Sequence, residues 1–176
     1  MLIYVPGKDI FSHPPDVTPV IPVNTDGVMG AGLAKQFKDR HPDHAITYRD
    51  ACRAGEFGIG ELMWIMGNDG LLVAVLFPTK KHWQNPSLID YIDRGLETLR
   101  HELLTHMGCA TSALALPMLG CGCGGLDWID VWSSIASHLG SLPGAYYVHG
   151  PAPERKNKIW RVGLPACFIS PPKRGY

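Results

Sequence analysis

The sequence predicts an α/β domain with a mostly parallel or mixed sheet that helices cover on both faces. Two observations lead to this fold class. Short segments that are apolar throughout alternate with amphipathic helical segments, and glycine-rich loops follow two of the apolar segments. The 176 residues, of which 45% are hydrophobic and 18% charged, suffice for one domain with a sizeable core.

Two strands and a helix are expected near the start of the chain. Residues 2–5 (LIYV) and 17–24 (VTPVIPVN) are the strand candidates. The two prolines of the second candidate favour a strand end or a sheet edge over the centre of a ladder. Residues 32–42 are expected to form a helix, because its apolar residues lie one turn apart and Pro42 marks its end.

A hairpin and two further strands follow from apolar runs later in the chain. Residues 61–66 and 71–78 flank the turn sequence GNDG, which is typical of a hairpin. Residues 112–117 (SALALP) form an apolar strand candidate, and residues 145–151 (AYYVHGP) form the last one.

Two more helices are expected from their periodicity. Residues 85–108 show the clearest helical pattern, which Asn85 or Ser87 could cap and Gly108 could end. Residues 127–140 form the second. The residues expected to face the core are Leu88, Ile92, Leu96, Leu99 and Leu103 in the first helix and Val131, Ile135 and Leu139 in the second.

Two glycine-rich loops stand at the carboxyl ends of predicted strands, which is where open α/β sheets bind ligands. NTDGVMGAG follows the strand at 17–24, GCGCGG follows the strand at 112–117, and each precedes a helix. Bare amides and the dipole at a helix N-terminus attract anions, so the two loops could hold two phosphates. Neither loop matches a standard nucleotide fingerprint, and tight turns made for packing explain the glycines equally well.

Composition and charge indicate in which compartment the protein acts and which partners it can contact. No apolar run approaches the roughly 20 residues that span a bilayer, and the N-terminus lacks the pattern of a signal peptide, so we expect no membrane association. The five cysteines are an odd number without a paired framework, which favours the cytoplasm. Residues 154–176 carry six basic residues and one acidic residue. Such a terminus can contact nucleic-acid phosphates or simply be solvated.

Four sequence blocks occur in the order GKDIF, PVNTDGVMGAGLAKQFKDRHPD, FPTKKHW and LPMLGCGCGGLDW. Together they resemble the macrodomain family, whose three-layer α/β/α fold with a mixed central sheet binds ADP-ribose. Within that family the chain most resembles the DNA ADP-ribosyl glycohydrolase antitoxins of the DarG type, and next the terminal ADP-ribose glycohydrolases. The resemblance implies a macrodomain at 1–152 and leaves 153–176 as a basic C-terminal extension.

The resemblance also implies which residues contact ADP-ribose. Asp9 would accept from the adenine amino group, with the Ile10 amide beside it. The contacts to the distal ribose and one phosphate would come from Asn24 and from the amides of Gly30, Ala31 and Gly32. The loop that wraps the diphosphate would comprise Gly120, Cys121, Gly122, Cys123, Gly124 and Gly125.

Lys80 matches the lysine that carries catalysis in both groups of relatives. The implied activity is removal of ADP-ribose from a modified target, above all a thymidine base of DNA. A lysine can attack the anomeric carbon as a neutral amine or stabilise the leaving group as a cation, and both roles stay open. From the residues alone, Lys80 and Lys81 could equally be two solvated lysines at a strand end. The terminal glycohydrolases place an aspartate where this chain has Gly124, which argues against the glutamate-linked reaction.

Two other classes of function fit the same motifs. One is a reader module that binds ADP-ribosyl groups without cleaving them, and the other is a hydrolase of a free ADP-ribose derivative. The expected partners are ADP-ribose or an ADP-ribosylated target, with single-stranded DNA as a further candidate, and we expect a monomer. We expect no cofactor and no metal, since Cys121 and Cys123 lack the spacing of a zinc site.

Four further residues lie near the motifs. Three of them have two possible interpretations, and the fourth is expected to have a local structural role. His82 and Trp83 could contact a base or stack on it, or they could be a helix cap and a core aromatic. Asp26 could shape a turn or take part in chemistry. Asp127 is expected at the start of a helix, where acidic residues are favoured.

Overall fold

The computed structural model describes residues 1–105 and 113–151, and within them six strands form one sheet. The strands are β1 (Leu2–Pro6), β2 (Thr18–Asn24), β3 (Met63–Met66), β4 (Leu72–Lys80), β5 (Ala113–Leu116) and β6 (Ala145–Gly150). Their order is β1-β6-β5-β2-β4-β3. All neighbours are parallel except β3, which is antiparallel to β4 as the predicted hairpin requires.

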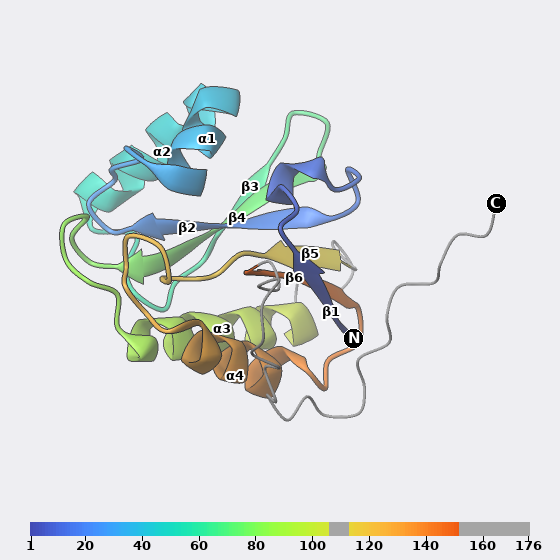
Figure 1. Ribbon diagram of the computed structural model, residues 1–176. Coiled ribbons are helices and arrows are strands. Elements are labelled where there is room, and N and C mark those ends of the chain that lie inside the picture. The colour runs from blue at the N-terminus through green and yellow to red at the C-terminus, as the bar shows by residue number, and fades with distance from the viewer. Residues whose placement is uncertain (106–112, 152–176) are drawn as a thin grey trace.

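Helices lie on both faces of this sheet, which confirms the three-layer α/β/α prediction (Figure 1). They are α1 (Gly32–Arg40), α2 (Pro42–Ala54), α3 (Ile89–Thr105) and α4 (Trp128–Leu139). The helices α1 and α2 cover one face, and α3 and α4 cover the other. None of the helices in the described ranges is both long and apolar enough to cross a membrane. The basic segment 153–176 lies outside the described residues.

The helix α2 was not expected from the sequence. Pro42 was interpreted only as the end of the preceding helix, and α1 does end at Arg40. However, proline is also favoured at the first position of a helix, where its missing N–H costs nothing, and Pro42 opens α2. A short 3-10 helix at Ile10–Ser12 was likewise not anticipated.

The prolines of β2 led to a wrong expectation about its place in the sheet. The strand lies between β5 and β4 and is central. It tolerates the prolines because its pairing with β5 covers only Thr18 and Pro19, whereas at Pro22 the strand pairs with β4 alone. A lost N–H donor at Pro22 therefore need not break a ladder on both sides.

The start of α3 also differs from the prediction. The helix begins at Ile89, so neither Asn85 nor Ser87 stands at its N-cap, and the buried Ser87 hydroxyl has no hydrogen-bond partner among the described residues. Leu88, expected in the apolar stripe, is 49% exposed, while the other four stripe residues are buried. The predicted end at Gly108 lies outside the described residues. The core-facing residues predicted for α4 are all buried.

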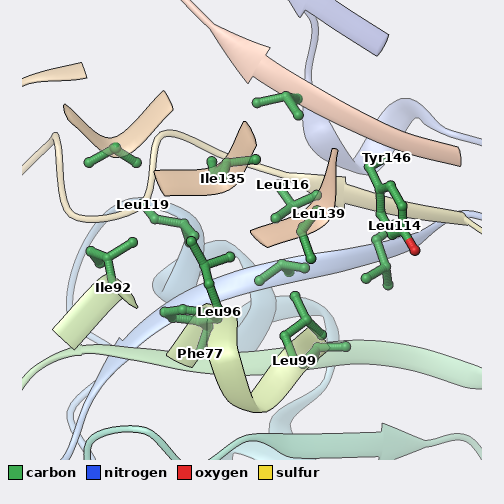
Figure 2. Close-up of a cluster of buried hydrophobic side chains, with 14 of the residues drawn as sticks. Phe77, Ile92, Leu96, Leu99, Leu114, Leu116, Leu119, Ile135, Leu139 and Tyr146 are labelled. Carbon is green, nitrogen blue, oxygen red and sulfur yellow. The ribbon is translucent and has the colours of Figure 1, made fainter. Parts of the chain in front are cut away.

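The larger core cluster lies between the sheet and the pair α3 and α4 (Figure 2). Phe77 of β4 is fully buried there together with Leu96 and Leu99 of α3. Gly95 lets α3 approach the sheet closely, because a Cβ at this position would overlap the Phe77 ring. The close packing of α3 on β4 also helps to position Lys80, because Lys80 is the last residue of the same strand.

We predict that Gly95→Ala destabilises the protein, although alanine is the better helix former. The added methyl group must displace the Phe77 ring, and overpacking of this kind costs about 1–3 kcal/mol. Urea denaturation measures the change in the free energy of unfolding. Adding Phe77→Leu to Gly95→Ala should recover part of that loss by making room. A neutral or stabilising Gly95→Ala would show that α3 does not approach β4 so closely.

Candidate functional site

A cleft of about 1110 Å³ opens at the carboxyl ends of the parallel strands. Its lining follows the strand order, with Lys8 after β1, His149 in β6, Met118 after β5, Asn24 at the end of β2 and Lys80 at the end of β4. Since neighbouring strands lie about 4.8 Å apart, the four intervals from β1 to β4 span about 19 Å. The sheet order therefore lays out a long cleft suited to an extended ligand.

The N-terminus of α1 faces this cleft with its amides uncapped. Gly30, Ala31, Gly32, Leu33 and Ala34 all line the cleft, and the N-cap residue Ala31 offers no side-chain acceptor. No acidic residue stands in the first turn. The free N–H groups and the helix dipole suit this helix end to an anion, which is what the first glycine-rich loop predicts.

The helix after the second glycine-rich loop does not repeat this arrangement. Asp127 is its N-cap, as expected, and its carboxylate accepts from the Ile129 amide at 2.9 Å. Asp130 adds a second negative charge in the first turn. These acids already occupy the positive end of α4, so a phosphate at the second glycine-rich loop would have to be held by the loop and not by the helix end.

The loop 120–125 offers main-chain amides to the cleft in place of a helix end. Within the described ranges the amides of Gly122, Cys123 and Gly124 donate to no protein acceptor. Two carbonyls of the loop are already engaged: Cys123 O accepts from Lys80 Nζ at 2.7 Å, and Gly124 O accepts from the Ser87 amide at 2.9 Å. The loop thus keeps donors available to an anion while these two acceptors are occupied.

The glycines of this loop serve two different purposes. A Cβ on Gly124 would overlap Gly120 O and Ser87 Oγ, and a Cβ on Gly120 would lie 2.8 Å from Leu126 Cδ1. These two glycines are required by packing within the protein, which corrects the expectation that the whole loop is bare for a ligand. At Gly122 a Cβ would meet nothing within 4 Å, so packing within the described residues does not require this glycine and the space beside it is open to a ligand.

Lys80 is a buried lysine of the cleft, with 9% of its surface exposed. A bulge between Val23 and Asn24 pairs Asn24 with Lys80, so the ends of β2 and β4 meet here. Its Nζ donates to Cys123 O at 2.7 Å and to Trp83 O at 3.4 Å. These two hydrogen bonds use two of the three positions on the nitrogen. The third position is an N–H if the lysine is charged and a lone pair if it is neutral.

The Asn24 side chain shapes the loop that follows β2. Its Oδ1 accepts from the amides of Asp26 and Val28 at 3.0 and 3.1 Å, and its Nδ2 donates to Val28 O at 2.7 Å. Buried Tyr48 donates to Asn24 O at 2.6 Å. Asn24 therefore lines the cleft as predicted, but its amide group is engaged inside the protein.

The Macro domain family model matches residues 20–135, most of the segment that forms this cleft. The chain belongs to the Macro domain family. It is 43% identical over 123 residues to the DNA ADP-ribosyl glycohydrolase of Mycobacterium tuberculosis, covering 69% of this chain and 34% of that protein. It is 38% identical over 139 residues to the enzyme of the same name from Thermus aquaticus, covering 76% and 37%. The chain thus spans about a third of the length of these curated relatives.

Solved structures support the same assignment. The macrodomain of Mycobacterium tuberculosis DarG superposes with a TM-score of 0.76 at 36% identity, over 86% of this chain and 99% of that one. Thermosipho africanus DarTG in complex with ADP-ribose superposes with a TM-score of 0.68 at 32% identity, over 89% of this chain and 43% of that one.

Three of the predicted site residues of this macrodomain do not line the cleft. Asp9 is exposed beside the lining residue Lys8, and its carboxylate accepts from the Phe11 amide at 3.1 Å as the cap of the 3-10 helix. Ile10 is buried. Gly125 has a φ of 76° and closes a turn by donating to Gly122 O.

Sequence reasoning missed His149, which lines the opposite end of the cleft from Lys80. Its Nδ1 lies 2.9 Å from Lys8 O, so Nδ1 carries the proton, and its Nε2 lies 2.9 Å from His13 Nε2. Burial lowers the pKa of both rings, that of His13 to about 4. At neutral pH His149 is therefore the acceptor and His13 the donor. The pair joins residues 136 positions apart, and no local pattern announces such a contact.

The cysteines of the macrodomain loop are not part of a candidate metal site within the described residues. Among residues 1–105 and 113–151 no group of three or more His, Cys, Asp or Glu side chains could hold a metal ion. Burial raises the pKa of the Cys121 thiol to about 11, so this cysteine is a neutral small residue in the loop.

The histidine pair predicts how stability depends on pH. Because the pKa of His13 is lower in the folded protein, the unfolded chain binds this proton more readily. Stability should therefore fall as the pH drops below about 6.5, the ordinary histidine value, and the fall should be complete near the folded value. Thermal unfolding between about pH 7.5 and about pH 4.5 measures the effect. His13→Phe should reduce the pH dependence, whereas His101→Phe on the surface of α3 should leave it unchanged. Equal pH dependence in all three proteins would contradict the assignment.

Proposed function

We propose that this macrodomain binds ADP-ribose along the cleft and hydrolyses the bond between ADP-ribose and a DNA base, with thymidine as the target. The observation that carries the proposal is the position of Lys80. The residue is 9% exposed, and its nitrogen donates to the loop 120–125 at the β4 end of a cleft about 19 Å long. The curated relatives are named for this activity, and one solved neighbour holds ADP-ribose.

The proposed pose follows from the layout of donors in the cleft. The diphosphate lies between the uncapped start of α1 and the amides of Gly122, Cys123 and Gly124. The adenine then extends toward Lys8 and His149, where Asp9 is the nearest carboxylate in sequence. The distal ribose extends the other way, toward Lys80. In this pose the anomeric carbon of the distal ribose faces the lysine nitrogen.

The reaction consumes one water and releases ADP-ribose and the unmodified base. In one route the amine lone pair of Lys80 forms a bond to the anomeric carbon, and the base leaves with the electron pair of the broken bond and takes up a proton. Water then displaces the lysine. In the other route a charged Lys80 stabilises the electron pair on the departing base while water attacks directly. Both routes use the single nitrogen position that Cys123 O and Trp83 O leave open.

The packing beneath the loop favours this activity over the glutamate-linked one. An aspartate at position 124, which the terminal ADP-ribose glycohydrolases have, would place its Cβ against Ser87 Oγ and Gly120 O. The site of this chain is therefore built for a lysine without an acid at position 124. We further propose that the macrodomain comprises residues 1–152 and that the basic extension 153–176 contacts DNA phosphates, which its net charge of +5 supports.

A reader module is the second candidate, and one observation favours it. The hydrogen bond from Lys80 to Cys123 O shapes the glycine loop, a role that needs no catalysis. In a reader, loss of Lys80 would weaken ADP-ribose binding, because the loop would lose its attachment to β4. In the enzyme, loss of Lys80 would chiefly reduce turnover.

The first test concerns Lys80. Lys80→Ala should retain ADP-ribose binding and slow ADP-ribose release from modified single-stranded DNA by about 10²–10⁴-fold. Lys80→Arg keeps the charge but cannot act as a neutral amine, so surviving activity would favour the electrostatic route. Lys81→Ala, an exposed neighbour, is the control and should stay close to wild type. Wild-type rates in Lys80→Ala would overturn the catalytic assignment. A wild type that binds but releases nothing would favour the reader.

The second test compares two glycines of the same loop. Gly122→Val should leave the melting temperature unchanged, because its Cβ meets nothing within 4 Å, and should weaken ADP-ribose binding at least about tenfold by filling the ligand space. Gly124→Val should lower the melting temperature, because its Cβ overlaps Gly120 O and Ser87 Oγ. Calorimetric titration and thermal unfolding measure the two quantities. Normal ADP-ribose binding in Gly122→Val would place the diphosphate elsewhere.

A further inference from the structure

Trp83 lies half exposed at the Lys80 end of the cleft, and the proposed ADP-ribose contacts do not use it. The residue lines the cleft, and 50% of its surface is exposed. The sequence left open whether it is a core aromatic, and this exposure excludes that interpretation. The residue thus combines an aromatic side chain with a carbonyl that lies 3.4 Å from the candidate catalytic nitrogen, so its position suits contact with a bound target.

Both main-chain groups of Trp83, its amide and its carbonyl, form hydrogen bonds at the Lys80 end of the cleft. Its amide donates to Asp26 Oδ2 at 3.0 Å, and its carbonyl accepts from Lys80 Nζ at 3.4 Å. The same lysine that would act on the anomeric carbon therefore also sets the distance to the indole-bearing residue. An aromatic ring on a fixed backbone has only two rotatable bonds to order when a ligand binds.

His82 stacks against Trp83 and extends the aromatic surface. The two ring centroids lie 6.0 Å apart, and the planes differ by 28°. The Gln84 amide donates to His82 Nδ1 at 3.3 Å, so Nε2 carries the proton and points toward Asp26 Oδ2 at 3.5 Å. Asp26 thereby contacts both members of the pair, and His82 supports the indole of Trp83, which is the member of the pair that lines the cleft.

We propose that Trp83, supported by His82, is the surface on which the ADP-ribosylated nucleobase stacks during hydrolysis. This inference rests on the proposed function, since it needs the anomeric carbon beside Lys80. Whatever group is joined to that carbon must then leave the cleft past Trp83. A nucleobase has a flat π-face that stacks on an indole, and it reaches the surface from single-stranded DNA or after leaving the base stack. A carboxylate side chain of a modified protein offers no such face.

The test separates binding of the base from binding of ADP-ribose. Trp83→Ala should leave the ADP-ribose dissociation constant unchanged and raise the KM for an ADP-ribosylated thymidine-containing oligonucleotide by about 5- to 150-fold, the range typical of base–aromatic stacking. Trp83→Phe keeps a π-face and should restore most of the loss. Leu104→Ala removes an equally exposed apolar side chain from the outer surface of α3 and should change neither quantity.

Three results would overturn the inference. Equal weakening of ADP-ribose and oligonucleotide binding by Trp83→Ala would place the indole inside the ADP-ribose site. An unchanged KM for the oligonucleotide would remove the stacking role. Equal effects on an ADP-ribosylated glutamate peptide would show that the surface does not select a base. If the wild type hydrolyses nothing, the proposed activity fails, but the affinity of the intact modified oligonucleotide relative to free ADP-ribose still tests the surface, and Trp83→Ala should abolish that advantage.

Discussion

The hydrogen bond from Lys80 Nζ to Cys123 O is the contact that holds the candidate catalytic nitrogen in place. It joins the end of β4 to a loop 43 positions later in the chain, and the second donation from the same nitrogen holds the carbonyl of Trp83. A buried ammonium or amine without partners would be costly, so the two carbonyls make the position of the lysine tenable. In return the lysine occupies Cys123 O, one acceptor of the loop. The proposed chemistry and the position of the Trp83 main chain therefore share one nitrogen.

The two walls of the cleft solve the problem of holding an anion in different ways. The start of α1 supplies helical amides and a dipole that no side chain neutralises. The loop 120–125 supplies main-chain amides alone, because Asp127 already caps α4. The difference has a structural reason: α1 begins directly at the glycine-rich loop, whereas α4 begins three residues after Gly125, outside the cleft lining. A negatively charged ligand thus meets one helix end and one bare loop.

The glycine-rich segments illustrate how far local sequence can be interpreted. Gly120 and Gly124 are needed because Ser87 and Leu126 press against them, and Gly122 is open to the cleft. The sequence GCGCGG does not indicate which glycines are needed for packing and which are open to the cleft. That difference depends on a serine more than 30 positions earlier in the chain. The missed helix α2 has a comparable cause. Pro42 both ends one helix and begins another, and the local pattern of α2, with Ala45 and Tyr48 as its buried residues, announced no second helix.

The sequence by itself determined the alternation of apolar strands and amphipathic helices, the hairpin, the cap at Asp127 and the segments that form the cleft, since each depends on residues close together in the chain. The four motif blocks also identified the family and singled out Lys80. Only the tertiary structure decided that β2 is central, that His13 meets His149, that Asn24 is engaged inside the protein and that Trp83 stays open beside Lys80. These features depend on the order of strands in the sheet and on contacts between distant segments. Periodicity and turn chemistry act over a few residues and cannot specify such contacts.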